Sequence, residues 1–363
     1  MRDPRQKKLA KIMVDYSTGV KKGDIVMIEY ADGTPVEFIR ELQTRCLERG
    51  ARYIRISRSD SDLVYNFYRR ADADQLAYFP RHELEFMKQV DVYIGIGSPL
   101  NNRTLAGIPG EVLSARQRLL RPIQEQRVEH SRWVITRYPT HSQAQEAGMS
   151  FEDFEDFYFR ACNIDWAREA RRQEKLKRLL KRSKSVRLLA PDTDLAFSIE
   201  GMPAIKCEGK RNLPDGEVYT APVKDSAEGY IRYNTPSLYQ GKLFRGIRFE
   251  VKKGRIVGAE AEAGGEHLAG ILDTDRGARR FGEFSFGLNR AIREPMLSTL
   301  FDEKIAGSIH LTPGRAYGEC DNGNRSAIHW DLVRIMRDGE IYLDDRLVQK
   351  RGKFVLPELK PLN

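Results

Sequence analysis

The chain has 363 residues, which is more than one hydrophobic core usually holds, so two domains are expected. Its composition, 40% hydrophobic and 31% charged, is typical of a globular protein, and the absence of any apolar run of about eighteen residues argues against a membrane span. The net charge of +9 comes almost entirely from residues 168–187, which contain ten Lys or Arg and two Glu, so it does not indicate a basic face spread over a folded domain for specific nucleic-acid binding.

The first half of the chain alternates short apolar strands with amphipathic segments. Strands rich in β-branched and aromatic residues are predicted at residues 24–30, 53–56, 90–96 and 133–136. Between the first two, residues 34–51 show helical apolar spacing and include Gly50, a residue typical of a helix end. This β–α–β alternation predicts a parallel sheet with flanking helices.

Residues 150–182 are predicted to be largely helical. Ser150 is an N-cap candidate, and the acidic residues that follow it suit the positive end of a helix dipole. The basic segment 168–187 is interpreted as a solvated helix whose Leu176, Leu179 and Leu180 pack inward, with non-specific affinity for polyanions as a by-product.

After Val186 the strand-like runs become short and Gly, Asn and Asp turns become frequent. Residues 213–222, 241–262 and 338–355 are predicted to form hairpins. The sequence therefore predicts an α/β domain over residues 1–186, ending in the basic helix, and an α+β domain with mostly antiparallel strands over residues 187–363.

The four cysteines, Cys46, Cys162, Cys207 and Cys320, lie far apart and form no CxxC motif. Scattered thiols in a chain of this size are typical of reduced cytoplasmic proteins. The charged start MRDPRQKK has no apolar segment behind it, so a secretory signal is not expected.

Potential metal ligands are concentrated in the second half of the chain. They are Glu217, Glu283, His310, His329 and Asp331. A zinc-type cation is satisfied by three protein ligands and a water molecule. Because five ligands exceed this need and carboxylates can bridge, the set predicts two cations in one site and a hydrolase that activates water.

His329 and Asp331 form the sharpest local pattern. Residues 325–335 are predicted to be a strand, on which residues two apart point to the same face, so the imidazole and the carboxylate converge while Trp330 packs behind them. The alternative is a His–Asp hydrogen bond that merely stabilises a hairpin.

The other three candidates are each open to a structural interpretation. His310 is predicted on a strand at residues 307–311, where a histidine is often a satisfied core residue. Glu283 is expected to share a face with Phe281 and Ser285. There its charge is costly unless a cation neutralises it.

Two arginines, Arg279 and Arg280, could equally neutralise the charge of Glu283. Glu217 opens a strand after a Pro-Asp-Gly turn and has no distinguishing feature by itself. The convergence of all five potential ligands in one half of the chain is what favours a metal site.

Other motifs are weaker. Glu266 and His267 lack the second histidine of an HExxH helix, and residues 94–100 lack the third glycine of a dinucleotide-binding loop. Asp273 and Asp275 are predicted to orient arginines.

Several segments of the chain resemble a known family. In the second half, GEVYTAP, LDTDRGARRFGEFSFGLN, LFDEKIAGSIHLTPGRAY and NRSAIHWDLV are similar to signature segments of the M29 metallo-aminopeptidases, the thermophilic aminopeptidase T type. In the first half, VKKGDIVMI, RWVITRYPT and QEAGMSFEDFEDFYFRAC are also similar, so the resemblance covers nearly the whole chain.

The resemblance implies an N-terminal α/β domain, a C-terminal metal-binding domain and a homodimer. The family's metal ligands fall on the five residues named above, and a family tyrosine near the metals falls on Tyr317. The expected substrates are small peptides with a free N-terminus, and the expected cofactors are two divalent cations, Zn, Co or Mn. The loop between His310 and His329 is shorter than the family pattern, which leaves the shape of the substrate pocket open.

In the mechanism that we expect, Glu283 handles the proton of the attacking water and Tyr317 donates a hydrogen bond to the developing oxyanion. No membrane partner is expected.

A different function class uses fewer ligands. His310, His329 and Asp331 alone make the two-histidine, one-carboxylate triad of mononuclear non-haem iron enzymes, so a ring-cleaving dioxygenase is the alternative. Glu217 and Glu283 favour the hydrolase, because one iron would not need them. A third interpretation, a polyanion-binding protein with a degenerate metal site, rests on the basic segment alone.

Overall fold

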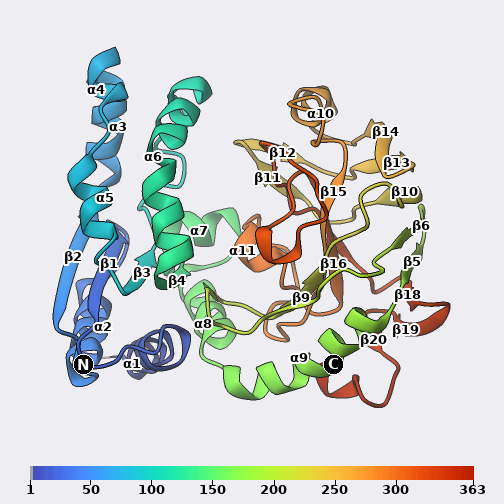
Figure 1. Cartoon of the computed structure of the whole chain (residues 1–363), viewed down its shortest axis with the longest axis horizontal. Coiled ribbons are helices and arrows are strands. Elements are labelled where there is room, and N and C mark those ends of the chain that lie inside the picture. Colours follow the sequence, from blue (N-terminus) through green and yellow to red (C-terminus); the bar gives the residue numbers. More distant parts are fainter. Residues whose placement is uncertain (1–2) are drawn as a thin grey trace. The chain divides into compact units, whose positions relative to one another are not determined.

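The computed structural model describes residues 3–363, which divide into two compact units (Figure 1). The first unit runs to Ile164 and also includes Gly209–Pro214, whereas the second comprises Asp165–Glu208 and Asp215–Asn363. This division differs from the predicted boundary after residue 186. The basic helix belongs with the second unit, because its Leu176 and Leu180 are buried in that unit's core.

The first unit is built on a parallel sheet in the strand order β2-β1-β3-β4-β8. Its strands are β1 (Ile25–Ala31), β2 (Tyr53–Ser59), β3 (Val92–Ile96), β4 (Arg132–Thr136) and β8 (Asn212–Leu213). The first four confirm the predicted strands. All five residues of β3 are buried, as expected for a central parallel strand.

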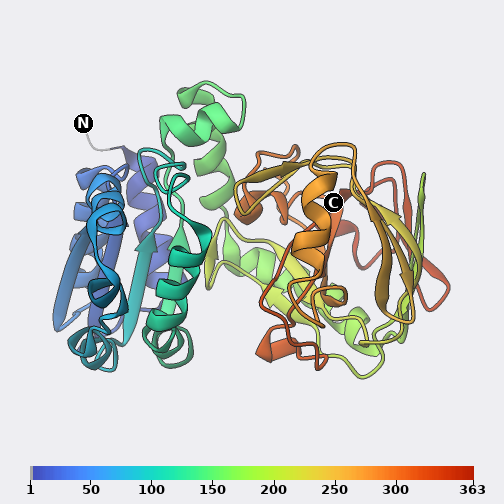
Figure 2. The ribbon, with the colours of Figure 1, turned by 90° about the horizontal axis from the view of Figure 1, so that it is seen from above.

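Helices flank this sheet (Figure 1 and Figure 2). They are α1 (Pro4–Lys11), the π-helical turn η1 (Ile12–Ser17), α2 (Val36–Glu48), α3 (Ser61–Arg70), α4 (Ala73–Ala77), α5 (Arg81–Met87), α6 (Gly110–His130), α7 (His141–Glu146) and α8 (Phe151–Cys162). The Ser150 hydroxyl accepts a hydrogen bond from the backbone N–H of Asp153 and caps α8 as predicted. Among residues 3–363, no helix is both long enough and apolar enough to cross a membrane.

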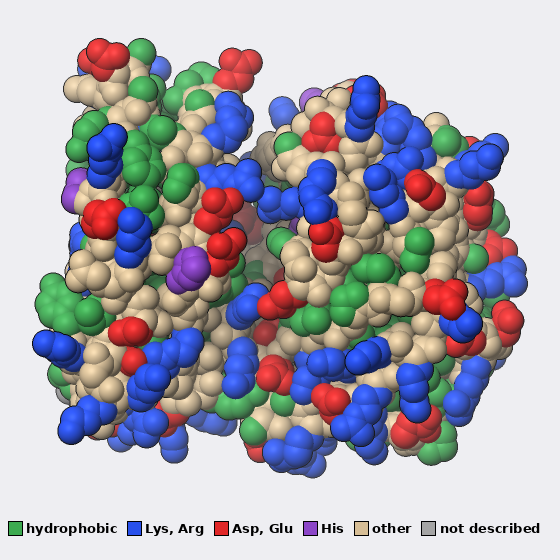
Figure 3. Space-filling view, in the orientation of Figure 1, with side chains coloured by type: hydrophobic (Ala, Val, Ile, Leu, Met, Phe, Trp, Pro, Cys, Tyr) green, Lys and Arg blue, Asp and Glu red, His purple; other side chains and the backbone are tan. Residues whose placement is uncertain are grey.

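The second unit begins with α9 (Trp166–Arg182), which carries the basic segment. Leu176 and Leu180 are fully buried and Leu179 packs partly against the same core, whereas most of the charged side chains face solvent. The interpretation as a solvated amphipathic helix is therefore confirmed. On the face of the molecule seen in Figure 3, Lys and Arg side chains are interspersed with Asp and Glu.

Two antiparallel sheets form the body of this unit. The larger has the order β14-β13-β10-β6-β5-β18-β19-β20 and comprises β5 (Ser185–Ala190), β6 (Thr193–Ser198), β10 (Glu228–Arg232), β13 (Arg248–Lys252), β14 (Arg255–Glu260), β18 (Glu340–Leu343), β19 (Arg346–Lys350) and β20 (Lys353–Phe354). The smaller has the order β17-β16-β15-β9-β7 and comprises β7 (Ile205–Cys207), β9 (Glu217–Thr220), β15 (Phe281–Gly287), β16 (Ser308–Pro313) and β17 (Val333–Ile335).

Shorter elements complete the second unit. They are the ribbon of β11 (Ser237–Tyr239) and β12 (Lys242–Phe244), the helices α10 (Gly265–Leu272) and α11 (Thr299–Asp302), and the 3₁₀ turns η2 (Gly318–Cys320) and η3 (Lys360–Leu362). The predicted α+β class with mostly antiparallel strands is confirmed.

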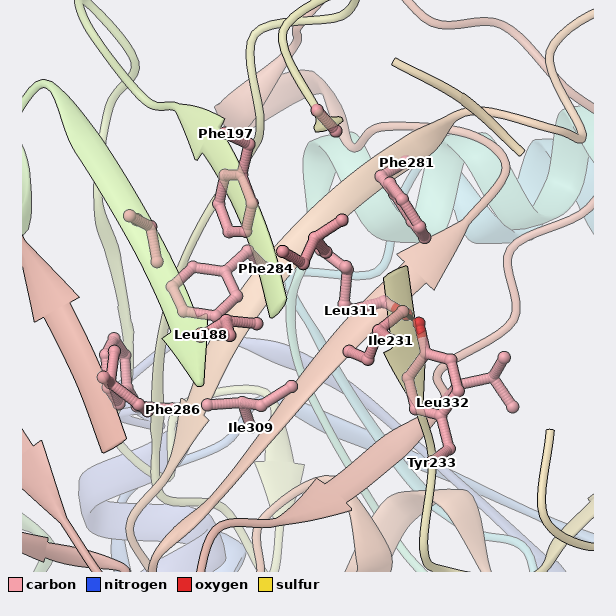
Figure 4. Close-up of a cluster of buried hydrophobic side chains, with 14 of the residues drawn as sticks. Leu188, Phe197, Ile231, Tyr233, Phe281, Phe284, Phe286, Ile309, Leu311 and Leu332 are labelled. Carbon is pink, nitrogen blue, oxygen red and sulfur yellow. Dashed lines mark hydrogen bonds between the residues drawn. The ribbon is translucent and has the colours of Figure 1, made fainter. Parts of the chain in front are cut away.

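The core of the second unit lies between its two sheets (Figure 4). Phe284 and Phe286 of β15 and Ile309 of β16 meet Leu188 and Phe197 of the larger sheet, and the Phe197 and Phe284 rings meet edge to face at 5.1 Å. Burying each such side chain contributes roughly 1.5–3 kcal/mol. Consequently one face of the small sheet is fixed against the core.

The predicted hairpins are confirmed in two of three cases. β13–β14 and β18–β19–β20 form as expected, with Lys253 and Gly254 in the left-handed turn. Residues 213–222 do not form a hairpin, because β8 pairs with β4 of the first unit whereas β9 pairs with β7 and β15 of the second.

Candidate metal centre

The polar residues of the small sheet lie on the face opposite its apolar core. Glu217 of β9, Glu283 of β15 and His310 of β16 occupy neighbouring strands. Ser285 pairs directly with His310, and Glu283 pairs with Thr312, so these side chains share one face by the two-residue period of a strand. The alternate residues of β15 and β16 fill the core, which makes both faces of these strands buried.

Phe281 does not share the face of Glu283, contrary to expectation. A bulge shifts the register of β15 against β16 between these two residues, and Phe281 joins Phe284 and Phe286 in the core. An extra residue in one strand reverses the alternation of side chains, and the sequence pattern alone does not reveal it.

Residues 325–335 are only partly a strand. β17 begins at Val333, and His329 makes an isolated bridge to Gly314. The segment is nevertheless extended beside β16, since the N–H of Trp330 donates to the carbonyl of Pro313. The predicted convergence therefore occurs, with His329 Nε2 3.2 Å from Asp331 Oδ1.

Trp330 packs on the opposite side of this segment, as predicted. Its ring stacks on Tyr239 at 4.8 Å, meets Phe244 edge to face and donates its indole N–H to Ser237. This buried anchor fixes the direction of the two flanking side chains.

The five predicted residues form two groups that share Glu283. Ligand atoms of Glu217, Glu283 and His310 lie within 4.8 Å of one another, and so do those of Glu283, His329 and Asp331. A third group of this kind, Cys207, Asp215 and Glu217, extends the set on the Glu217 side. Each group offers the nitrogen and carboxylate donors that divalent cations take, so these residues could hold metal.

Both histidines are oriented as metal ligands usually are. His329 Nδ1 lies 2.7 Å from the carbonyl oxygen of Arg315, and His310 Nδ1 lies 3.4 Å from that of Glu303. In the neutral imidazole that binds a metal, an Nδ1–H that donates to a carbonyl leaves the lone pair on Nε2, and in both residues Nε2 faces a carboxylate of the cluster.

The charged groups of the cluster shift one another's pKa. Burial raises the pKa of the Glu283 carboxyl, although the nearby His310 opposes the shift. Burial alone would lower the pKa of His310, but hydrogen bonding to Glu283 and the charge of Glu217 raise it to about 10. In the same way Asp331 outweighs burial and raises the pKa of His329 to about 9. The carboxylates thus favour a positive charge at the centre of the cluster, on the histidines or on a bound cation.

The sequence did not single out a buried lysine at the edge of the site. Lys304 is fully buried, with Nζ 3.3 Å from Glu217 Oε1 and an ion pair to Glu303. It follows α11 in a loop, where no periodic pattern marks a side chain as inward-facing. Thr312 was also missed; its hydroxyl donates to Asp331 Oδ1 at 2.7 Å.

Tyr317 lies beside the second group. Its ring centroid is 4.3 Å from that of His329, and the residue is 45% exposed. It therefore combines contact with a candidate ligand and access from solvent.

The arginines that could have neutralised Glu283 are engaged elsewhere. Arg279 pairs with Asp273, as predicted, and Arg280 pairs with Asp225. Asp275 does not orient an arginine; instead its carboxylate accepts hydrogen bonds from the backbone of Gly277, Ala278 and Ala327 and from Ser326. No arginine partner of Glu283 is thus found among residues 3–363.

Comparison with known proteins gives a consistent result. The family model of the thermophilic metalloproteases (M29) matches residues 2–343. Aminopeptidase T of Thermus thermophilus is 29% identical over 375 residues, covering 90% of this chain and 91% of the relative. Aminopeptidase 2 of Geobacillus stearothermophilus is 25% identical over 352 residues, covering 85% and 83%.

Two solved structures share the fold. Wild-type AmpT from Thermus thermophilus matches with a TM-score of 0.85 and 26% identity, over 97% of this chain and 99% of that chain. A 2,5-dihydroxypyridine dioxygenase from Pseudomonas putida KT2440 matches with a TM-score of 0.65 and 16% identity, over 98% of each chain. At that identity the second likeness concerns the fold alone.

Proposed function

The chain belongs to the M29 family of thermophilic metalloproteases and is a metallo-aminopeptidase, and we propose that it cleaves the first peptide bond of small peptides with water activated by two divalent cations. The observation that carries this proposal is the pair of three-residue groups that share Glu283. In this proposal Glu217, Glu283 and His310 would hold one cation, and Glu283, His329 and Asp331 would hold the other.

Two cations bound there would lower the pKa of a water molecule toward neutrality and polarise the scissile carbonyl. The residues of the chain supply the remaining functions. Glu283, whose carboxyl pKa is raised by burial, takes the proton of the attacking water. Tyr317, in contact with His329, donates its phenolic hydrogen to the oxyanion that develops on the substrate.

Specificity for the N-terminus follows from the charge of the substrate's free α-amine. A free α-ammonium group pairs with a carboxylate of the cluster, which an internal peptide nitrogen cannot do. Cleavage is then limited to the bond next to that amine.

The alternative, a one-iron dioxygenase using His310, His329 and Asp331, leaves two buried carboxylates without a role. Glu217 is 5% and Glu283 6% exposed, and both lie within ligand distance of His310, where a two-cation site uses them but a single iron does not need them. The two glutamates therefore support the hydrolase.

The finer attributes belong to the same proposal. Zn, Co or Mn suits the mixed imidazole and carboxylate donors. Cys46, Cys162, Cys207 and Cys320 form no disulfide within residues 3–363, which supports a reducing, cytoplasmic location. A homodimer is proposed on the family resemblance.

Metal analysis of the purified protein is the direct test of the two-cation site. We expect about two Zn, Co or Mn per chain. A content of one Fe per chain, with oxygen uptake on a dihydroxylated aromatic compound, would contradict the proposal.

The substitution Glu283→Gln tests the proton role. It keeps the shape of the side chain but removes the charge, so hydrolysis of an amino-acid p-nitroanilide should fall by at least about 10²-fold. The control is Glu250→Gln, which changes an exposed carboxylate of β13 and should leave the rate unchanged. Near-normal turnover of a folded Glu283→Gln variant would refute the assigned role.

A further inference from the structure

A polar pocket lined by none of the candidate metal ligands lies in the second unit. Its volume is about 550 Å³, within the range of small-molecule sites. The lining residues are Lys224, Arg255, Arg276, Gly277, Arg280, Gly323, Asn324 and Arg325. Five of them are cationic and none is a carboxylate, so the pocket has the electrostatic character of an anion site.

The backbone brings these cations together from distant parts of the chain. Arg255, at the start of β14, forms an antiparallel bridge with Arg280, which precedes β15. Residues opposite each other in such a bridge extend their side chains on the same side, and like charges so placed repel. An anion bound between the two guanidinium groups would relieve that repulsion.

The turn that carries Lys224 contacts the β13–β14 turn through the backbone. Gly254 adopts a left-handed conformation, and a Cβ atom there would lie 2.1 Å from the carbonyl oxygen of Lys224. Only glycine permits this approach, because any side chain would push the turn away.

The other side of the pocket is equally fixed. A Cβ on Gly277 would lie 1.9 Å from the carbonyl oxygen of Arg325, so the two loops touch through their backbones. Asn324 is buried and donates its amide hydrogens to the carbonyls of Gly277 and Gly314 at 2.9 and 2.6 Å. The cationic side chains therefore project from a preorganised frame, which reduces the entropy cost of binding.

The acidic neighbours neutralise only part of this charge. Asp225 pairs with Arg280 and Asp321 with Arg325, and these carboxylates are 67% and 36% exposed. Exposed ion pairs of this kind are weak and exchange readily for a better partner. In the part of the chain that the structure describes, Lys224, Arg255 and Arg276 take part in no salt bridge.

We propose that this pocket binds a small anion with several phosphate groups. Four of its five cations are arginines, whose planar guanidinium groups match phosphate oxygens with two parallel hydrogen bonds. A chain of two or three phosphates carries enough charge to meet Lys224, Arg255 and Arg276 together.

The phosphate groups can come from inorganic polyphosphate or from a nucleotide. The probes are tripolyphosphate and a nucleoside triphosphate, titrated calorimetrically into the metal-loaded protein at 150 mM salt. One site per chain is expected for tripolyphosphate. Equal affinity for both probes means that the pocket recognises phosphates alone, whereas tighter nucleotide binding means that base or sugar contacts add to it.

The double variant Arg255→Ala/Arg276→Ala should weaken tripolyphosphate binding at least tenfold. The control, Lys242→Ala/Arg346→Ala, removes the same charge from exposed positions on β12 and β19 and should bind like the unmodified protein. Neither variant changes a candidate metal ligand. Any binding of tripolyphosphate to the metal ions therefore contributes equally to the affinities measured for both variants. Equal binding by pocket and control variants, or no binding to the unmodified protein, would overturn the proposal while leaving peptidase activity as a separate question.

Discussion

At the scale of single residues, the candidate metal centre is a concentration of carboxylates with little exposure to solvent. Glu217 and Glu283 are buried and Glu303 is partly buried, and burial raises the pKa of Glu303 to about 8. Lys304 is the permanent cation among them. We infer that it holds Glu217 in place before metal binds.

Replacing Lys304 by Met should destabilise the protein by roughly 3 kcal/mol or more, because it leaves buried carboxylates without their cation. The loss should be larger in chelator than with metal, and urea unfolding in both conditions measures it. Lys350→Met breaks the half-exposed pair with Glu340 and should cost less than about 1 kcal/mol. A Lys304→Met protein as stable as its parent would show that the lysine has no electrostatic role.

The role of Tyr317 is tested by removing one oxygen atom. Tyr317→Phe should lower kcat about 10²–10³-fold with little change in KM, because the proposed hydrogen bond is made only to the developing oxyanion. Tyr230→Phe, at an exposed position of β10, is the control. If kcat stays within twofold, Tyr317 merely packs against His329.

At the scale of elements, alternation explains why the site could be partly predicted. Strands that place Phe284, Phe286 and Ile309 in the core necessarily place their alternate residues on the opposite face. His310 and Ser285 follow this rule. Phe281 and Glu283 do not follow it, because a bulge lies between them. The position of a bulge depends on the register with a partner strand.

The last residue of α11, Asp302, is a buried titratable group that gives a pH-dependent stability. Asp302 accepts hydrogen bonds from the N–H groups of Met296 and Ser298. Burial nevertheless raises its carboxyl pKa from 3.8 to about 7. Because the folded pKa exceeds the unfolded one, the contribution of Asp302 to stability is largest below about pH 4 and is lost as pH rises through 7.

Asp302→Asn is uncharged at every pH, so its stability relative to the parent should increase by roughly 1 kcal/mol or more between pH 5 and pH 8. Denaturation midpoints of both proteins at the two pH values measure this double difference. An amide accepts fewer hydrogen bonds than a carboxylate, and this loss changes the stability of Asp302→Asn equally at both pH values. It therefore cancels in the double difference. A pH-independent difference would show that Asp302 is ionised throughout.

At the scale of the whole molecule, we expect metal binding and folding of the second unit to be coupled. The candidate ligands come from β9, β15, β16 and the segment before β17, so cations would link elements that are distant in sequence. A ligand that binds only the folded state stabilises it by about 4 kcal/mol at a thousand times its Kd.

Removing metal with a chelator should therefore lower Tm by several degrees, and restoring Zn, Co or Mn should reverse the change. Differential scanning calorimetry with metal analysis of each sample is the measurement. The variant Glu217→Gln/Asp331→Asn should respond much less to chelator. An unchanged Tm after verified metal loss would contradict the coupling.

The sequence by itself determined the fold class, the strands of the first unit, the amphipathic basic helix and the candidate ligands. These depend on local periodicity and side-chain chemistry, which the chain carries in its order of residues. Tertiary structure alone decided that α9 belongs to the second unit, that β8 joins the sheet of the first unit, and that Lys304 lies beside Glu217. It also decided the bulge before Glu283 and the gathering of five cations around one pocket. Each of these depends on contacts between segments far apart in sequence, and such contacts leave no periodic trace in either segment.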